Sequence, residues 1–453
     1  MYIVKLTSVI KNSDILYGND LQIIKNGLII VNNQGIIEKV GKTLDIEDTA
    51  YYSKIMQKKD TNIIDAKGYL IIPGLVNSHI HIGDAIGKDI SSSGDLDARV
   101  HPNHSIKKTI LENTEIDQLK QFMRNAAISM LNKGITTFVD FREGGLHGVN
   151  MLQTAIKDIP IKSVILGRFD FHCFYTMQND KKELIKSNDL QNQNNITKHD
   201  EIKEEEIFKF GKNLLKSCNG FGISGANENE DNILKIYKNI IKGINKEKYD
   251  KKERAIIAIH AAESIETVKE SLKRTGKTEI ERTIFTLEPD LYIHLTNPTR
   301  IDLDLLQSLN KGIVVCPRAN GILGTGIVPL KTLIERGFTI AIGTDNIMLN
   351  SPDLFKEMDF LLKCQRAYEK NLSFLDAKMV LKMATINGGK LLNRNIGCID
   401  DGFQADLLFI DKYDVDIYPM HDPYMSVVHR YSERAIKAIM VDGKFVHKKY
   451  LIN

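Results

Sequence analysis

The sequence contains few cysteines, and none of them is placed as a disulfide framework would require. Five cysteines are scattered over 453 residues, and no two of them form a CxxC pair. An odd and scattered set indicates reduced thiols and a cytoplasmic location rather than a disulfide-bonded, secreted protein. The opening stretch MYIVKLTSVIKNSDI lacks the apolar core of a secretory signal. No apolar run approaches the roughly 18 residues of a membrane span, so no membrane partner is expected.

A surplus of charge of one sign is also missing. The chain carries 61 Lys and Arg against 58 Asp and Glu, a formal net charge of +3. This balance argues against a nucleic-acid partner, because neutralising many phosphates needs a clear basic surplus. The charged fraction of 26% and the hydrophobic fraction of 42% are those of a globular protein and exclude a disordered polymer. A chain of this length forms two or three ordinary domains, or one large α/β barrel with an accessory domain.

Short apolar strands alternate with longer amphipathic segments over residues 71–387. We count eight apolar runs, and helical patterns such as 115–132 and 352–365 lie between most of them. Eight β–α repeats predict an α/β fold of the (β/α)8 TIM-barrel class. The runs are YLIIPGLVN, ITTFVDF, VILGRFDF, GFGIS, AIIAIHAA, LYIHLT, GIVVCP and IAIGTDN.

The two ends of the chain have a different character. Residues 1–70 and 388–453 contain strands rich in β-branched residues, and they predict one small composite β-sandwich domain built from both ends. Residues 177–206 interrupt the barrel with a polar stretch that is poor in apolar side chains. This stretch is either a solvated surface insertion or a mobile lid over the barrel mouth, since loops after barrel strands lie there.

Histidines and carboxylates stand at the ends of the first, fifth, sixth and eighth predicted strands. They are His79, His81, His260, Glu263, His294 and Asp345. Taken singly, each histidine could be an ordinary strand residue, Glu263 a surface residue and Asp345 a helix N-cap. His79 and His81, however, are two residues apart on a strand, so both side chains point to one face about 6.5–7 Å apart. Because catalytic residues of barrels come from the carboxyl ends of strands, the joint placement predicts a site for Zn²⁺ or Fe²⁺.

The motifs around these residues resemble those of the amidohydrolase superfamily. The resembling stretches are PGLVNSHIH, HAAE, the single histidine on the next strand, and GTDN. CPRANGILGTGIVPL, NSPDLFKEMDFLL and GFQADLLFID are similar to segments of one branch, which contains cytosine deaminase and S-adenosylhomocysteine deaminase (ATZ/TRZ). The resemblance covers nearly the whole chain apart from residues 177–206.

This resemblance implies a role for each matching residue. The matches are His79, His81, His260 and Asp345 to the metal ligands, Glu263 to the proton shuttle, and His294 to the histidine that orients the water. It implies one divalent ion, zinc or alternatively iron, because the run GFGISGANE lacks the lysine that bridges two ions in binuclear members. A small heterocyclic substrate is implied as well, and we expect a homodimer.

The chain departs from the branch where its members read their substrates. Val315 occupies a position where many members have a histidine, and Arg318 one where a small residue is common. Arg142 and Arg318 could together bind a carboxylate or a phosphate. Each of them could equally be a surface arginine or part of a structural ion pair. Asp84 and Asn320 are further candidates for substrate contact.

The predicted function is hydrolysis of a C–N bond other than a peptide bond. The leading hypothesis is deamination of a purine, pyrimidine or related heterocycle by a metal-activated water. The same site could instead open a cyclic amide, as in relatives of imidazolonepropionase, or remove chlorine from a ring. A non-catalytic barrel scaffold is a further alternative, but such relatives have usually lost metal ligands, and none is missing here.

Overall fold

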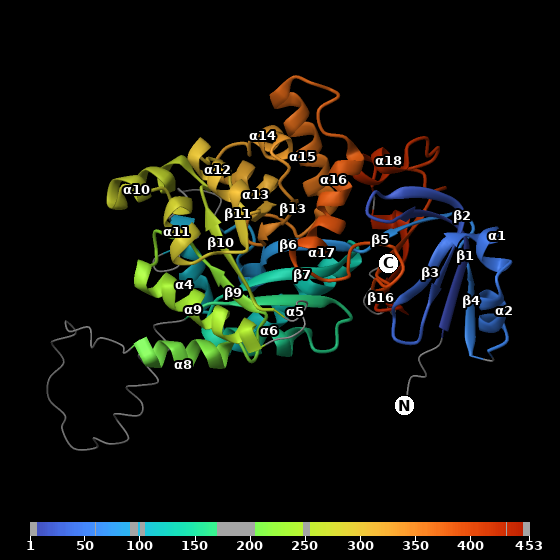
Figure 1. The fold of residues 1–453 in the computed structure, drawn as a ribbon, viewed down its shortest axis with the longest axis horizontal. Coiled ribbons are helices and arrows are strands. Elements are labelled where there is room, and N and C mark those ends of the chain that lie inside the picture. Colours follow the sequence, from blue (N-terminus) through green and yellow to red (C-terminus); the bar gives the residue numbers. More distant parts are fainter. Residues whose placement is uncertain are drawn as a thin grey trace, which may run out of the picture.

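Two β-sheets organise the chain (Figure 1). The computed structural model describes residues 7–58, 60–90, 98–99, 105–169, 204–247, 254–431 and 433–446. Residues 177–203 of the predicted polar insertion lie outside these ranges, and its last residues begin helix α8 (Glu204–Leu214). The two interpretations of that insertion therefore stay predictions.

A curled parallel sheet forms the larger part of the molecule and confirms the predicted barrel class. Its strands, within the described ranges, are β6 (Leu75–His81), β7 (Ile135–Arg142), β8 (Lys162–Gly167), β9 (Gly220–Ile223), β10 (Ile256–Ala261), β11 (Leu291–His294), β12 (Gly312–Val315), β13 (Ile340–Ile342) and β14 (Asp345–Asn346). β13 pairs with β12, whereas β14, only a few residues later, pairs with β6. One stretch of chain thus joins the last strand to the first and closes the sheet.

The barrel strands are covered on both faces. Every residue of β7 is buried, as expected for a parallel strand with packed side chains inside and helices outside. Val139 and Phe141 belong to the cluster inside the barrel, while Phe138, the residue before Val139, packs with the layer of helices. This packing from two sides holds the strand ends, and the residues on them, in fixed positions.

Helices follow the strands and surround the barrel (Figure 1). The predicted helical patterns at 115–132 and 352–365 correspond to α5 and α15. Within the described ranges, the helices and short helical turns of this part are α8 together with η1 (Ile82–Gly87), α4 (Ile106–Glu112), α5 (Ile116–Asn132), α6 (Gly145–Ile156), α9 (Asp231–Glu247), α10 (Ile265–Thr275), α11 (Glu279–Thr286), α12 (Arg300–Ser308), α13 (Pro317–Leu323), α14 (Leu330–Glu335), α15 (Leu354–Glu369), α16 (Ala377–Met383) and α17 (Ile386–Leu391). In the part of the chain that the structure describes, no helix combines the length and apolarity needed to cross a membrane.

Strands from both chain ends build the second sheet, which confirms the predicted composite β-domain. They are β1 (Thr7–Tyr17), β2 (Gln22–Val31), β3 (Ile37–Lys42), β4 (Thr61–Asp65), β5 (Tyr69–Pro73), β15 (Leu407–Asp411), β16 (Ile436–Val441) and β17 (Lys444–Phe445). The order is β17-β16-β15-β5-β1-β2-β3, with β4 paired to β1. β15 lies between β16 and β5, so the late strands extend the early ones (Figure 1). Helices α1 (Thr43–Glu47) and α2 (Ala50–Met56) complete this end, while α18 (Pro423–His429), followed by the turn η3 (Glu433–Ala435), packs against α15 and α16.

The apolar run YLIIPGLVN belongs to both sheets. Its first half is β5, which pairs with β15, and its second half is β6, the first barrel strand. The chain passes from one sheet to the other at Gly74, where a Cβ atom would lie 2.3 Å from Thr136 Oγ1. Glycine is therefore required at this close approach. The boundary expected between residues 70 and 71 falls inside β5.

Candidate active site

His79 and His81 lie at the carboxyl end of β6 and are buried. The ring of Phe141 on β7 packs edge-on against His79, with 4.4 Å between ring centroids. On the other side, a Cβ atom at Gly343 would lie 2.6 Å from His79 Cβ and 2.8 Å from its carbonyl oxygen. The segment between β13 and β14 therefore passes so close to His79 that only glycine fits there. His79 is thus packed between β7 and this segment.

Three further candidate site residues lie near the carboxyl ends of β10, β11 and β13. His260 is on β10, His294 is the last residue of β11, and Asp345 begins β14. The backbone φ angles of His294 and Asp345 are +75° and +58°, values that residues other than glycine seldom adopt. Thr344 N donates to His79 O at 3.0 Å and holds the segment of Asp345 against β6. Such strained conformations persist where surrounding contacts determine them, typically at functional sites.

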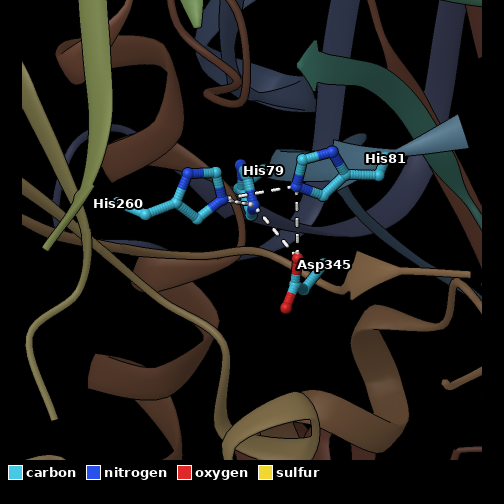
Figure 2. Close-up of side chains that lie close together, drawn as sticks. All are labelled: His79, His81, His260 and Asp345. Carbon is cyan, nitrogen blue, oxygen red and sulfur yellow. Dashed lines mark hydrogen bonds and ion pairs between the residues drawn. The ribbon is translucent and has the colours of Figure 1, made fainter. Parts of the chain in front are cut away.

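The side chains of His79, His81, His260 and Asp345 converge on one point (Figure 2). The Nε2 atom of His260 lies 3.2 Å from His79 Nε2 and 3.3 Å from His81 Nε2. Asp345 Oδ1 lies 3.2 Å from His79 Nε2 and 3.6 Å from His81 Nε2. Four ligand atoms placed tetrahedrally at about 2.0–2.1 Å from one ion would be about 3.3–3.4 Å apart. The spacing of this group therefore fits a single divalent metal ion.

The protonation states of these residues also suit a metal. Burial lowers the pKa of all three histidines, that of His81 to about 3, which keeps the imidazoles neutral. Burial opposes the ionisation of Asp345, but its hydrogen bond with His79 and the neighbouring imidazoles hold its pKa below the usual range. His260 Nδ1 donates to Ile223 O at 3.0 Å and leaves Nε2 free. Neutral imidazoles and a carboxylate are the forms that bind zinc.

Glu263 and His294 face the same carboxylate. With Asp345 they form a second group whose nearest side-chain atoms all lie within 4.8 Å of one another. His294 Nε2 lies 3.6 Å from Glu263 Oε2. Burial raises the pKa of Glu263 to about 7, the range in which a carboxyl group can both give and take a proton near neutral pH. The arrangement can therefore move protons beside a metal site.

Asn320, expected among the substrate contacts, lies against His294. Its Oδ1 is 2.9 Å from His294 Nδ1, so with the amide oxygen as acceptor the proton of His294 sits on Nδ1. The Nε2 atom then faces Glu263 as an acceptor. Asn320 is almost completely buried, and this contact can orient the ring of His294.

The other candidates for substrate contact have partners within the protein. Arg142 is 3% exposed, contacts the carboxylate of Glu143, and lies 3.6 Å from Asp140. The guanidinium of Arg318 donates to Ser351 O at 3.1 Å. The structure thus places Arg142 and Arg318 in separate networks.

Asp84 is likewise engaged with its neighbours. Its carboxylate accepts from Asn346 Nδ2 at 2.6 Å and from Met348 N at 3.2 Å. These contacts tie it to the residues that follow Asp345. A direct contact of Asp84, Arg142 or Arg318 with substrate stays a proposal.

Comparison with known proteins agrees with this geometry. Residues 70–446 match the amidohydrolase family. A putative aminohydrolase of Methanothermobacter thermautotrophicus is 33% identical over 442 residues, which are 97% of this chain and 99% of that protein. The chain belongs to the amidohydrolase family.

Two further comparisons bear on this amidohydrolase. The 5-methylthioadenosine/S-adenosylhomocysteine deaminase of Thermococcus sibiricus is 26% identical over 451 residues, covering 97% of this chain and 94% of that protein. A crystal structure of an adenosine deaminase from Xanthomonas campestris with bound zinc has a TM-score of 0.76 at 17% identity. That match covers 99% of this chain and 94% of the other, and it shows the shared fold. The resemblance drawn from the motifs is confirmed, and the chain is a metal-dependent hydrolase.

Glu279 is a residue of this amidohydrolase that the motifs do not indicate. It begins α11, and its Oε2 accepts from Ala262 N at 3.0 Å and from Thr267 Oγ1 at 3.1 Å. Ala262 has a φ of +51° and directly precedes Glu263. Glu279 therefore fixes the turn that carries the proposed proton shuttle. Its only signal in the sequence is a place at the start of a helix.

We expect Glu279→Gln to flatten the dependence of stability on pH. Burial raises the pKa of Glu279 to about 8, against about 4.3 for a glutamate in an unfolded chain. The folded protein binds this proton more tightly, so the contribution is complete below about pH 4 and is lost as the pH rises through 8. Between pH 5 and 9 the unfolding free energy of the wild type should therefore fall by more than that of the variant. The difference between the two falls should be on the order of a few kcal/mol.

Denaturant unfolding at several pH values measures this effect. Glu270→Gln, an exposed position on α10, is the control and should follow the wild type. Parallel curves for wild type and Glu279→Gln would contradict the expectation.

Proposed function

We propose that this amidohydrolase deaminates the adenine ring of a nucleoside and releases ammonia. The observation that supports this proposal most strongly is the placing of Glu263, His294 and Asp345 together beside the three imidazoles. Deamination needs a nucleophilic water and a proton donor on the same side of the ring. Asp345 and His294 could hold the water and Glu263 could donate the proton, and the nearest side-chain atoms of the three lie within 4.8 Å of one another. The deaminase relative from Thermococcus sibiricus matches over nearly its whole length.

His79, His81, His260 and Asp345 would hold one divalent ion, for which we propose zinc, with iron as the alternative. When bound, such an ion supplies a Lewis acid that makes a water nucleophilic near neutral pH. A single ion is proposed because β9 and the residues that follow it, GFGISGAN, carry no lysine that could bridge two ions.

The protein's own side chains would move the protons. The carboxylate of Asp345 is placed to accept a proton from the attacking water. His294, with its proton held on Nδ1 by Asn320, orients that water through Nε2. Glu263 protonates the ring nitrogen next to the attacked carbon. It then takes the proton of the hydroxyl group added to that carbon and passes it to the departing amine, which leaves as ammonia. Its raised pKa keeps a protonated fraction available near neutral pH.

The compartment and assembly belong to the same proposal. Cys218, Cys316, Cys364 and Cys398, the cysteines within the described ranges, are free thiols. Free thiols support the cytoplasmic location expected from their scattered spacing. The homodimer stays a prediction, which analytical ultracentrifugation of the purified protein would test.

Measuring ammonia release from a panel of rings tests the substrate class. The panel contains adenosine, 5-methylthioadenosine, S-adenosylhomocysteine, guanine, cytosine, a carboxylated imidazolone and a chlorinated triazine. We expect ammonia from nucleosides that carry an adenine ring and none from the same protein with Glu263→Gln. Turnover confined to ring opening or chloride release, without ammonia from any substrate, would overturn the deaminase proposal.

A further inference from the structure

We propose that Lys107 is a positioning residue of the metal centre. It lies on helix α4, outside the barrel sheet. Its ammonium group lies between the carboxylates of Glu143 and Asp84. Each carboxylate reaches a different part of the ligand set. The proposal rests on the metal site of the proposed function but not on any particular substrate.

The first contact runs through Glu143 to His81. Lys107 Nζ lies 2.6 Å from Glu143 Oε1, and that oxygen lies 3.3 Å from His81 Nδ1. Because His81 Nε2 points to the ligand cluster, Glu143 faces the opposite nitrogen of the same ring. The other carboxylate oxygen of Glu143 contacts the guanidinium of Arg142. Glu143 is thus held at both oxygens and can fix the orientation of His81, as carboxylates beside metal-binding histidines do.

The second contact runs through Asp84 to the segment of Asp345. Lys107 Nζ lies 3.6 Å from Asp84 Oδ2. The same oxygen accepts from Asn346 Nδ2 at 2.6 Å, and Oδ1 accepts from Met348 N at 3.2 Å. Asn346 directly follows Asp345, whose backbone is in the strained left-handed region. Asp84 therefore helps to hold the turn in which Asp345 points to the cluster.

Burial makes this arrangement depend on the lysine. The side chain of Lys107 is 7% exposed, that of Asp84 2% and that of Glu143 14%. Glu143 contacts two cationic groups, those of Lys107 and Arg142, and the side chain of Arg142 is itself 3% exposed. Removing the ammonium group would take away a positive charge that balances two poorly solvated carboxylates. Both carboxylates would then be driven to reorient. His81 would then lose its contact with Glu143, and the segment of Asp345 would lose its contacts with Asp84.

Metal affinity of the purified full chain, without substrate, tests this role. Zinc affinity is measured by competition with a chelator, and the ligand geometry by the visible absorption of the cobalt-loaded protein. We expect Lys107→Met and Glu143→Gln each to weaken zinc binding by about 10–100-fold and to change the cobalt spectrum. Lys107→Arg, which keeps the charge, should recover much of the loss.

Lys162→Met is the matched control, because Lys162 also lies between two carboxylates, those of Asp406 and Asp442. It begins β8, at the end of the barrel opposite the metal site, and its loss should leave zinc affinity and the cobalt spectrum unchanged. Wild-type affinity and spectrum in folded Lys107→Met, or an equal loss in Lys162→Met, would overturn the proposal. If Lys107→Met does not fold, Glu143→Gln decides: weakened zinc binding supports the proposal, and unchanged binding overturns it. Since no substrate is used, a wrong substrate class cannot produce either result.

Discussion

His79→Ala should yield a folded protein that binds no zinc at micromolar concentration and releases no measurable ammonia. His79 Nε2 is 3.2 Å from both His260 Nε2 and Asp345 Oδ1, so its loss opens the centre of the ligand set. Loss of a direct ligand should exceed the roughly 10–100-fold loss of metal affinity that follows removal of an outer partner. Without the ion, the nucleophilic water is also lost.

Metal content by atomic emission and ammonia release by coupled assay measure the two effects on one sample. His147→Ala, which removes an exposed histidine on α6, is the control and should keep both. Asp345→Asn should behave like His79→Ala, because it removes the only negative charge of the ligand set while keeping the size of the side chain. A His79→Ala protein with full zinc content and wild-type turnover would contradict the assigned metal centre.

Glu263→Gln should separate metal binding from catalysis. Glu263 lies beside His294 and Asp345 but outside the set of four converging ligands, so zinc content should stay at the wild-type level. An amide cannot shuttle protons, and loss of a general acid–base group typically costs about 10²–10⁴-fold in turnover. The expected result is therefore a fully metallated protein with kcat reduced by this factor.

Steady-state kinetics with the best substrate of the panel, together with metal analysis, measures this separation. Glu266→Gln, an exposed position only three residues further along, provides the control and should retain kcat. Turnover of Glu263→Gln equal to the wild type would remove Glu263 from the mechanism. Loss of zinc in the same variant would instead assign Glu263 to the ligand set.

The barrel and the convergence of the proposed metal ligands could be predicted because both leave local marks in the sequence. Buried parallel strands appear as short apolar runs, and parallel order brings all their carboxyl ends to one mouth. His260 and Asp345 are far apart in the chain but each closes such a run, so their convergence follows from the fold class. The HxH pair adds a period-two mark that places both imidazoles on one face.

The division of the run YLIIPGLVN between two sheets could not be predicted. Both halves of the run, Tyr69–Pro73 and Leu75–His81, read as strands, and strand pairing is decided by partners more than 300 residues away, such as Phe409 opposite Ile71. The same limit applied to the polar candidates. Asn320 was a candidate for substrate contact in the sequence, but only the structure shows that it contacts His294 Nδ1.

The sequence by itself determined the family, the barrel and the four converging residues proposed as metal ligands, because these depend on hydrophobic periodicity and on motifs at strand ends. Only the tertiary structure decided how those ligands are supported. Lys107, Glu143 and Asp84 come from a helix and from segments that follow two different strands, and no period or spacing connects them. Their contacts are polar, short-ranged and between distant segments, so they exist only once the hydrophobic core has brought those segments together.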